Sequence, residues 1–148
     1  MTRYQAANME IFIAEIDDLP KLLPQAEPLI QVVLDRIPPE TNMQLIKRDL
    51  YKGKLQMIVA VEDDVLYGLA LLNIVSYPTG YKLLDIPVVS GTRMEDWLVT
   101  GFGMIKDLAR QNNCKETRGY SLRKGWFRKL NSDQLDFTSL YEVVSHKL

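Results

Sequence analysis

The stretch "YKLLDIPVVSGTRMEDW", Tyr81 to Trp97, joins an apolar strand to a helix and decides the fold class of this chain. Pro87 cannot donate to a strand ladder, so we expect the strand to bulge, or to part from a neighbour, near its C-terminal end. That distortion leaves a gap in the sheet. From Met94 to Ala109 apolar residues recur at helical spacing, which predicts a helix that packs one stripe against the sheet.

The turn between this strand and this helix is a candidate phosphate site, because unpaired N–H groups and partial positive charge gather anions at a helix N-terminus. Thr92-x-x-Glu95 has the pattern of a capping box, in which we expect the Thr92 hydroxyl to accept from the N–H of Glu95. Two carboxylates there, Glu95 and Asp96, would repel a pyrophosphate by about 1 to 4 kcal/mol per charge pair. Arg93 is a counterargument, since its guanidinium could bind a phosphate. We favour a structural cap over a phosphate cradle.

Length and composition fit one globular domain over residues 1–148, since 47% of the 148 residues are hydrophobic and 25% are charged. The net charge of -1 gives no overall attraction to nucleic acid or to acidic lipid. No apolar run approaches the roughly 20 residues that span a bilayer, and no secretion signal opens the chain. We therefore expect no membrane association and a cytoplasmic location. Cys114 and His146 are the single cysteine and histidine, so neither an intrachain disulfide nor a histidine-rich metal site is expected.

Before the opening stretch, the pattern predicts a strand over Glu10–Ile16 and then two helices. The first helix carries apolar residues at three- and four-residue steps and is broken at "RIPPE". Thr41-x-x-Gln44 has the pattern of a capping box that opens the second helix, which stops at Gly53. Three strands follow, and their short, turn-rich separators favour an antiparallel meander of "KLQMIVAVE", "VLYGLALLNIV" and "YKLLDIPVV".

Beyond the helix that ends before Cys114, we expect a short strand, "KETRGYS", a basic helical turn, "LRKGWFRKL", and a last strand, "DFTSLYEVVSHKL". The complete order is strand, two helices, three strands, helix, strand, helix, strand. This order, with a proline-marked distortion at the end of the fourth strand, resembles the GNAT fold of the acetyl-CoA-dependent N-acyltransferases. The resemblance implies a single α+β domain with a mixed, mostly antiparallel sheet and helices on both faces.

The segment "ARQNNCKETRGYSLRKGWFRKL" also resembles a group of GNAT-like proteins encoded by tailed bacteriophages, in which an Arg-(Lys or Arg)-Gly-Trp turn opens the last helix. Here the turn residues are Arg123, Lys124, Gly125 and Trp126. Some similar phage proteins are associated with virion interiors. The resemblance therefore implies a phage-encoded protein of the host cytoplasm or of the virion, with a phage or host protein as its partner.

The acyl-CoA signature of the GNAT enzymes, an (Arg or Gln)-x-x-Gly-x-(Gly or Ala) loop that holds the pyrophosphate, is missing from the turn before the long helix. Gly101-x-Gly103 falls in mid-helix and has Leu98 where the basic residue or Gln belongs. Gly101 more simply permits a close approach of helix and sheet. No cofactor is expected on this reading. In the alternative reading, an N-acetyltransferase with an atypical donor loop, acetyl-CoA is held by Val89, Ser90, Gly91, Thr92 and Arg93.

Catalytic groups are equally hard to assign. Many GNAT enzymes use a tyrosine of the last helix to protonate the leaving thiolate, and the corresponding position here is Phe127, which cannot donate a proton. That role is empty or has moved to Tyr120 or Tyr141. A general base could be Asp85 or Glu142, and the sequence does not choose between them.

The basic turn is the remaining positive signal, since four cations surround Trp126 within seven residues: Arg123, Lys124, Arg128 and Lys129. We expect Trp126 to face the core and the four cations to face solvent, where they are available to a protein partner. Nucleic acid is not the expected partner, because the rest of the chain is not basic. The favoured function is a non-catalytic binding or virion-associated module, and the alternative is an N-acetyltransferase.

Overall fold

The strand-forming segments pair into one sheet. The computed structural model describes residues 3–120, 135, 137–141 and 143–148. The sheet has six strands in the order in which they occur in the chain, and every neighbouring pair is antiparallel except the last, β5 with β6. The strands are β1 (Arg3–Ala6), β2 (Met9–Ile13), β3 (Gln56–Glu62), β4 (Val65–Ser76), β5 (Lys82–Gly91) and β6 (Glu116–Gly119).

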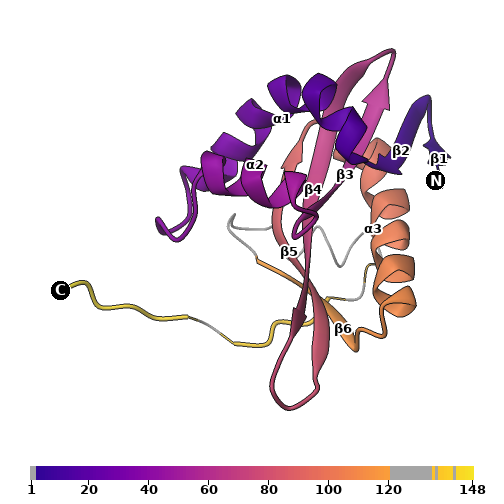
Figure 1. Cartoon of the computed structure of the whole chain (residues 1–148). Helices are drawn as coiled ribbons and strands as arrows, with labels where there is room; N and C mark the ends of the chain where they lie inside the picture. The colour runs from indigo at the N-terminus through magenta and orange to yellow at the C-terminus, as the bar shows by residue number, and fades with distance from the viewer. Residues whose placement is uncertain (1–2, 121–134, 136, 142) are drawn as a thin grey trace.

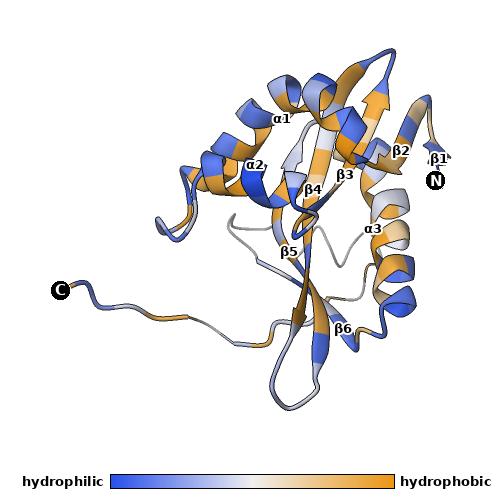
Figure 2. Ribbon diagram, in the orientation of Figure 1, coloured by the Kyte–Doolittle hydropathy of each residue, from blue (hydrophilic) through white to orange (hydrophobic). Residues whose placement is uncertain are grey.

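Helices cover both faces of this sheet (Figure 1). A 3-10 turn, η1 (Ile16–Asp18), leads into α1 (Leu19–Leu34), which lies with α2 (Met43–Tyr51) on one face, and α3 (Met94–Gln111) lies on the other. Each layer turns its hydrophobic side inward (Figure 2) and builds its own core against the sheet. The predicted fold class, α+β with a mixed, mostly antiparallel sheet between helices, is confirmed.

The N-terminal half departs from the sequence prediction in two details. The strand predicted over Glu10–Ile16 is β2, which ends earlier, at Ile13. It forms a hairpin with β1, a strand that the sequence pattern missed. The second helix is capped by Asn42 and not by Thr41, since the Leu45 N–H donates to the Asn42 side-chain oxygen at 2.9 Å. The predicted box had the Thr41 hydroxyl accept from the Gln44 N–H, so the observed cap lies one residue later than expected and binds a different donor, the Leu45 N–H.

The predicted last strand is wrong over its described part. Residues 137–141 and 143–148 form no strand. Val143 and Val144 are 84% and 89% exposed, so this apolar pair gains nothing from a sheet face. Phe137 instead packs its ring 4.9 Å from that of Phe102 on α3. The predicted basic turn lies outside the described residues.

The proline in β5 distorts the sheet as the sequence predicts. Val88 pairs with Leu71 and Asp85 with Asn73, so two residues of β5, Ile86 and Pro87, stand opposite one residue of β4. Pairing with β6 stops at Ile86. Beyond this point β5 continues to Gly91 with β4 alone, which leaves the expected gap between β5 and β6.

The start of α3 is seated on the sheet by one tryptophan and two glycines. Trp97 is 2% exposed, and its indole ring occupies the space that a Cβ on Gly68 would need. Gly91, the register partner of Gly68, has a φ of 133° and lies against the Tyr67 backbone, where a side chain would clash. Gly101, expected to allow this close approach, meets only Trp97 of its own helix at 3.6 Å, an ordinary contact. That expectation is wrong, and Gly68 has the role.

We predict that Gly68→Ala lowers the free energy of unfolding by about 1 to 3 kcal/mol, the range for overpacking a filled site. The matched control is Gly103→Ala in α3, which has nothing within 4 Å of its added Cβ. That change should raise stability by about 0.5 to 1 kcal/mol, because alanine favours a helix over glycine. Urea unfolding measures both, and equal midpoints for wild type and Gly68→Ala would contradict the seating of Trp97.

Candidate functional site

The turn between β5 and α3 is built differently from the capping box that the sequence predicts. The Thr92 N–H donates to the Tyr67 carbonyl at 2.8 Å, and the Thr92 carbonyl accepts from the Trp97 indole at 2.8 Å. These bonds hold Thr92 in line with β5, so the helix begins two residues later with Arg93 as its N-cap. No side chain caps α3. The predicted capping box from Thr92 to Glu95 is therefore wrong, and the Thr92 hydroxyl does not bind an N–H group at the N-terminus of α3.

Arg93 is the cation of this turn, and it is already paired. Its guanidinium donates to Glu62 and to Asp96, each at 2.9 Å, and lies 4.8 Å from the centre of the Tyr67 ring. The hydrogen bond that Arg93 donates to Glu62, followed by the one that it donates to Asp96, raises the pKa of Arg93 further above its ordinary value. Glu95 adds a further negative charge to the first turn of α3, whereas the carboxylates bonded to the guanidinium are those of Glu62 and Asp96. A diphosphate at this turn would have to draw Arg93 away from its acids.

A second set of polar groups lies where β5 and β6 part. Asp85 alternates with Leu84 and Ile86, which belong to the core on the α3 side, so its side chain lies on the opposite face. The hydroxyl of Tyr120, the first residue after β6, donates to the Asp85 carboxylate at 2.9 Å. Two of the residues considered for acid–base chemistry are therefore brought into contact by the fold.

Burial sets the protonation of this pair. Desolvation raises the pKa of Asp85, and the hydrogen bond from Tyr120 and the charge of Arg118 only partly oppose it. Desolvation first, and then the bond to Asp85, raises the pKa of Tyr120 to about 12. A carboxylate with a raised pKa is a better proton acceptor. Tyr120 is in turn a poor acid, because its raised pKa makes the loss of its proton less favourable.

Arg118 on β6 is the register partner of Asp85, and it connects the Asp85–Tyr120 pair to Glu116. Its Nη2 donates to Glu116 at 2.8 Å, and the same carboxylate oxygen accepts from the Tyr81 hydroxyl at 2.6 Å. Sequence reasoning missed Arg118 and Tyr81. The alternation of Glu116, Arg118 and Tyr120 in "KETRGYS" is the signal that could have placed them on one face of a strand.

Two other candidates for these roles are not part of the pair. Tyr141 is 65% exposed, although it lies near enough to Arg118 and Tyr120 to affect both charges. Glu142 lies outside the described residues, as do the four cations expected to contact a partner, Arg123, Lys124, Arg128 and Lys129.

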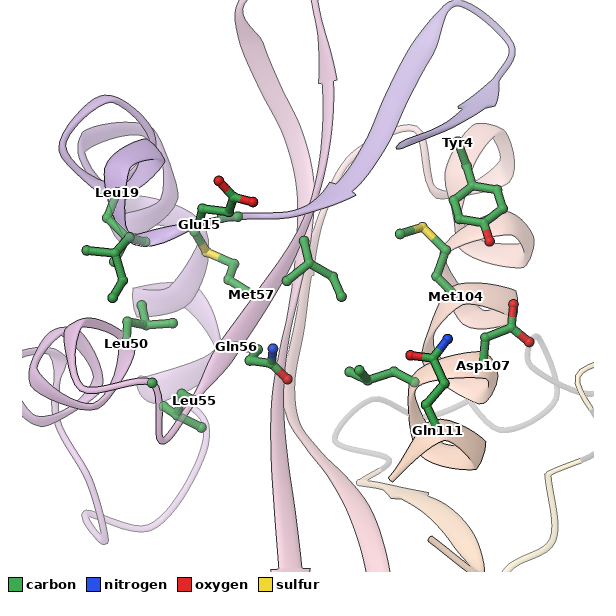
Figure 3. A pocket seen from close by; sticks show the side chains of 15 residues that line it. Tyr4, Glu15, Leu19, Leu50, Leu55, Gln56, Met57, Met104, Asp107 and Gln111 are labelled. Atoms are coloured by element: carbon green, nitrogen blue, oxygen red, sulfur yellow. The ribbon is translucent and has the colours of Figure 1, made fainter. Parts of the chain in front are cut away.

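A separate groove lies away from the turn between β5 and α3 and from the Asp85–Tyr120 pair. This groove, of about 470 Å³, opens at the edge of the sheet where β2 has ended and β3 begins (Figure 3). Its walls come from α1, α2 and the C-terminal half of α3, and none of residues 89–93 lines it. Glu15 and Asp107 are its charged lining groups, and no cation lines it. The charged side chains among its described lining residues therefore disfavour an anionic ligand.

Two features are absent from the described residues. They contain no group of three or more histidine, cysteine or acidic side chains placed to hold a metal ion. Among the helices formed by residues 3–120, none has the length and apolar character to cross a bilayer.

Comparisons with solved structures identify the fold. The chain is similar over 95% of its length to an aminoglycoside acetyltransferase from an uncultured soil metagenomic sample in complex with sisomicin, with 13% identity, a TM-score of 0.69 and 95% of that chain covered. It is similar to a ribosomal-protein-alanine N-acetyltransferase of Brucella melitensis biovar Abortus 2308, with 14% identity, a TM-score of 0.68, and 95% and 99% of the two chains covered. An acetyltransferase of Trypanosoma brucei gives 18% identity, a TM-score of 0.62 and the same coverage.

At these identities the likeness shows the fold alone, and it is the fold of the GNAT acetyltransferases. No protein-family model matches the sequence. A search of curated proteins likewise found no match.

Because Asn42 caps α2 and Thr92 does not cap α3, alanine should cost stability at Asn42 and not at Thr92. Asn42→Ala should destabilise the protein by about 0.5 to 2 kcal/mol, because it removes the acceptor of the Leu45 N–H. Thr92→Ala should change stability by less than about 0.5 kcal/mol, because the exposed Thr92 takes part through its backbone. Urea unfolding of both variants measures the difference, and a larger loss at Thr92 would restore the capping box.

Proposed function

We propose that this protein is an acetyl-CoA-dependent N-acetyltransferase with an atypical donor loop, in which Asp85 is the general base. The observation that carries the proposal is the hydrogen bond between Tyr120 and Asp85 at the point where β5 and β6 separate. A partly buried carboxylate, held by a neighbour and placed at a gap in the sheet, is an arrangement typical of a proton acceptor in a reaction site.

The chain's own residues would act in a short sequence. Asp85 accepts a proton from the ammonium group of the acceptor, which frees the nitrogen lone pair for attack on an acyl carbon. Acetyl-CoA, when bound, would supply an acetyl group on a thiol leaving group. Tyr120 stays protonated and positions the Asp85 carboxylate, because its pKa of about 12 makes it a poor donor to a thiolate. The nitrogen loses a second proton as the amide forms, so two protons are released in all: one protonates the departing thiolate and the other goes to water, and Asp85 carries the first of them.

The donor turn fits this proposal in part. The N-terminus of α3 carries no side-chain cap, so backbone N–H groups there can meet an anion, and the turn would hold the donor along Val89, Ser90, Gly91, Thr92 and Arg93. Arg93 is within this turn but is bonded to Glu62 and Asp96. Binding would therefore exchange two ion pairs for contacts with phosphate, which makes the loop atypical.

A second candidate function follows from the same pairing of Arg93. If Arg93 stays with its two acids, the turn is a closed structural element and the protein is a non-catalytic binding module. Such a module would be phage-encoded and would meet a phage or host protein, in the host cytoplasm or the virion, through Arg123, Lys124, Arg128 and Lys129. The resemblance of the "LRKGWFRKL" turn to phage GNAT-like proteins supports this reading.

Substitution of the base tests the proposed chemistry. Asp85→Asn should lower kcat/KM for acetyl transfer to an amine by about 100- to 10,000-fold, the usual contribution of a general base. In the wild type the pKa of Asp85 is raised above 3.8, so kcat/KM should fall with decreasing pH at a midpoint above that value. The variant should lose this limb of the profile.

The matched control is Asp107→Asn on the exposed side of α3, which should leave kcat/KM unchanged. As pH rises through the titration of Asp85, the expected activity increases whereas the contribution of Asp85 to folding stability decreases. The pKa of Asp85 is higher in the folded state than in the unfolded state. Its contribution to stability therefore falls as pH rises from the unfolded-state pKa through the folded-state pKa. Asp85→Asn should therefore melt no lower than wild type at pH 7, and an inactive but fully stable variant supports a chemical role.

Acetyl-CoA binding separates the two candidate functions. A ligand at 100 times its Kd stabilises by about 2.7 kcal/mol, which is a rise of several degrees in Tm for a chain of this size. The enzyme proposal predicts a saturable rise, and a larger one in Glu62→Gln, because that change releases Arg93 from one acid. No rise with millimolar acetyl-CoA in either protein would favour the non-catalytic module.

A further inference from the structure

One face of the β5–β6 pair carries a compact polar patch that the proposed proton transfer uses only in part. Asp85 and Arg118 are register partners on parallel strands, so their side chains project from the same face. Glu116 and Tyr120 share that face by alternation, and the Tyr81 hydroxyl reaches it through its bond to Glu116. A negative and a positive group thus lie side by side at the entrance to the gap.

Arg118 is the one described residue with a buried side-chain nitrogen or oxygen that lacks a hydrogen-bond partner, its Nε–H. Its contact with Glu116 uses Nη2 alone, which leaves the two-nitrogen edge of the guanidinium incompletely paired. An unpaired buried donor disfavours the present side-chain position, and an oxyanion that accepted from both Nε and Nη2 would satisfy it. Arg93 offers a contrast, since its Nε and Nη1 each meet a carboxylate.

We infer that the acceptor carries a carboxylate beside its amine, as an α-amino acid does, and that Arg118 binds that carboxylate while Asp85 receives the ammonium group. The inference rests on the proposed function, because it names the acceptor of the same site. The two charged ends of an α-amino acid are separated by a single carbon, which matches two side chains that project from paired positions on adjacent strands.

The exposed tyrosines around Arg118 add apolar surface for the rest of such an acceptor. Tyr77, Tyr81 and Tyr120 are 43%, 39% and 55% exposed, and Tyr77 lies near enough to influence the charge of Arg118. An acceptor with an aromatic side chain could bury part of this surface. A polycationic acceptor is disfavoured, because Arg118 would repel it from the position beside Asp85.

Acetyl transfer to a pair of matched amines tests the inference. L-phenylalanine and L-phenylalaninamide share the ring and the amine and differ in the negative charge. Wild type should show a KM for phenylalanine at least about tenfold lower, and Arg118→Gln should raise that KM by about 10- to 100-fold with little change for the amide. Arg118→Lys keeps the charge but loses the planar guanidinium, so its KM for phenylalanine should lie between those of wild type and Arg118→Gln. Arg110→Gln, an exposed arginine on α3, is the control and should behave as wild type.

Calorimetric titration without acetyl-CoA makes the outcome independent of turnover. Binding of phenylalanine that is lost in Arg118→Gln, with no acetylation of any amine, would support the acceptor site and remove the proposed enzyme function. Acetylation of the amide or of sisomicin, a polycationic aminoglycoside, at least as fast as phenylalanine would keep the enzyme and overturn the inference. An equal loss for both acceptors in Arg118→Gln, or no binding of phenylalanine by wild type, would overturn it as well.

Discussion

Pro87 has no N–H to give to a neighbouring strand, and both the sheet and the proposed site depend on that missing donor. Two residues of β5 stand opposite one of β4 at this point, which reverses the alternation of faces. Leu84 and Ile86 therefore pack toward α3, whereas Val88 packs toward α1. Pairing with β6 ends at the same place, so Asp85 is the last acid on β5 before the strands separate. A single backbone constraint thus fixes the core on both faces and opens a gap beside a carboxylate.

Two arginines near β5, one in the turn after it and one on the neighbouring β6, show why residue type alone does not identify a ligand site. Arg93 follows β5 and is satisfied by two carboxylates and by the Tyr67 ring, so a ligand must compete for it. Arg118, paired with Asp85 in the register, meets one carboxylate and keeps an unpaired Nε–H. Charge availability, and not the number of cations, therefore favours a ligand contact at the β5–β6 end of the sheet over the donor turn.

Sequence reasoning succeeded where a local rule is strong enough to resist its surroundings. The apolar period of α3, the meander of three strands and the proline distortion are local signals, and all three are present. It failed where a distant partner decides the geometry. The Thr92 cap was wrong because the Tyr67 carbonyl and the Trp97 indole hold the Thr92 backbone in line with β5. Gly101 was assigned a close contact that belongs to Gly68, which is distant in sequence from α3 and meets Trp97 only once the sheet has formed.

The candidate site was foreseen as separate residues and not as an arrangement. In the sequence, Asp85 and Tyr120 each look like ordinary strand residues. Their contact depends on the parallel pairing of β5 with β6, which joins residues 35 positions apart and leaves no periodic pattern in the sequence. Burial raises the pKa of Asp85, so its ionised form destabilises the folded protein near neutral pH, although Tyr120 and Arg118 partly offset the cost. A purely structural position would be served as well by an asparagine, which accepts the same hydrogen bond and carries no charge. A carboxylate at a position where its charge is unfavourable, in contact with Tyr120 beside the gap in the sheet, supports the proposed proton transfer at Asp85.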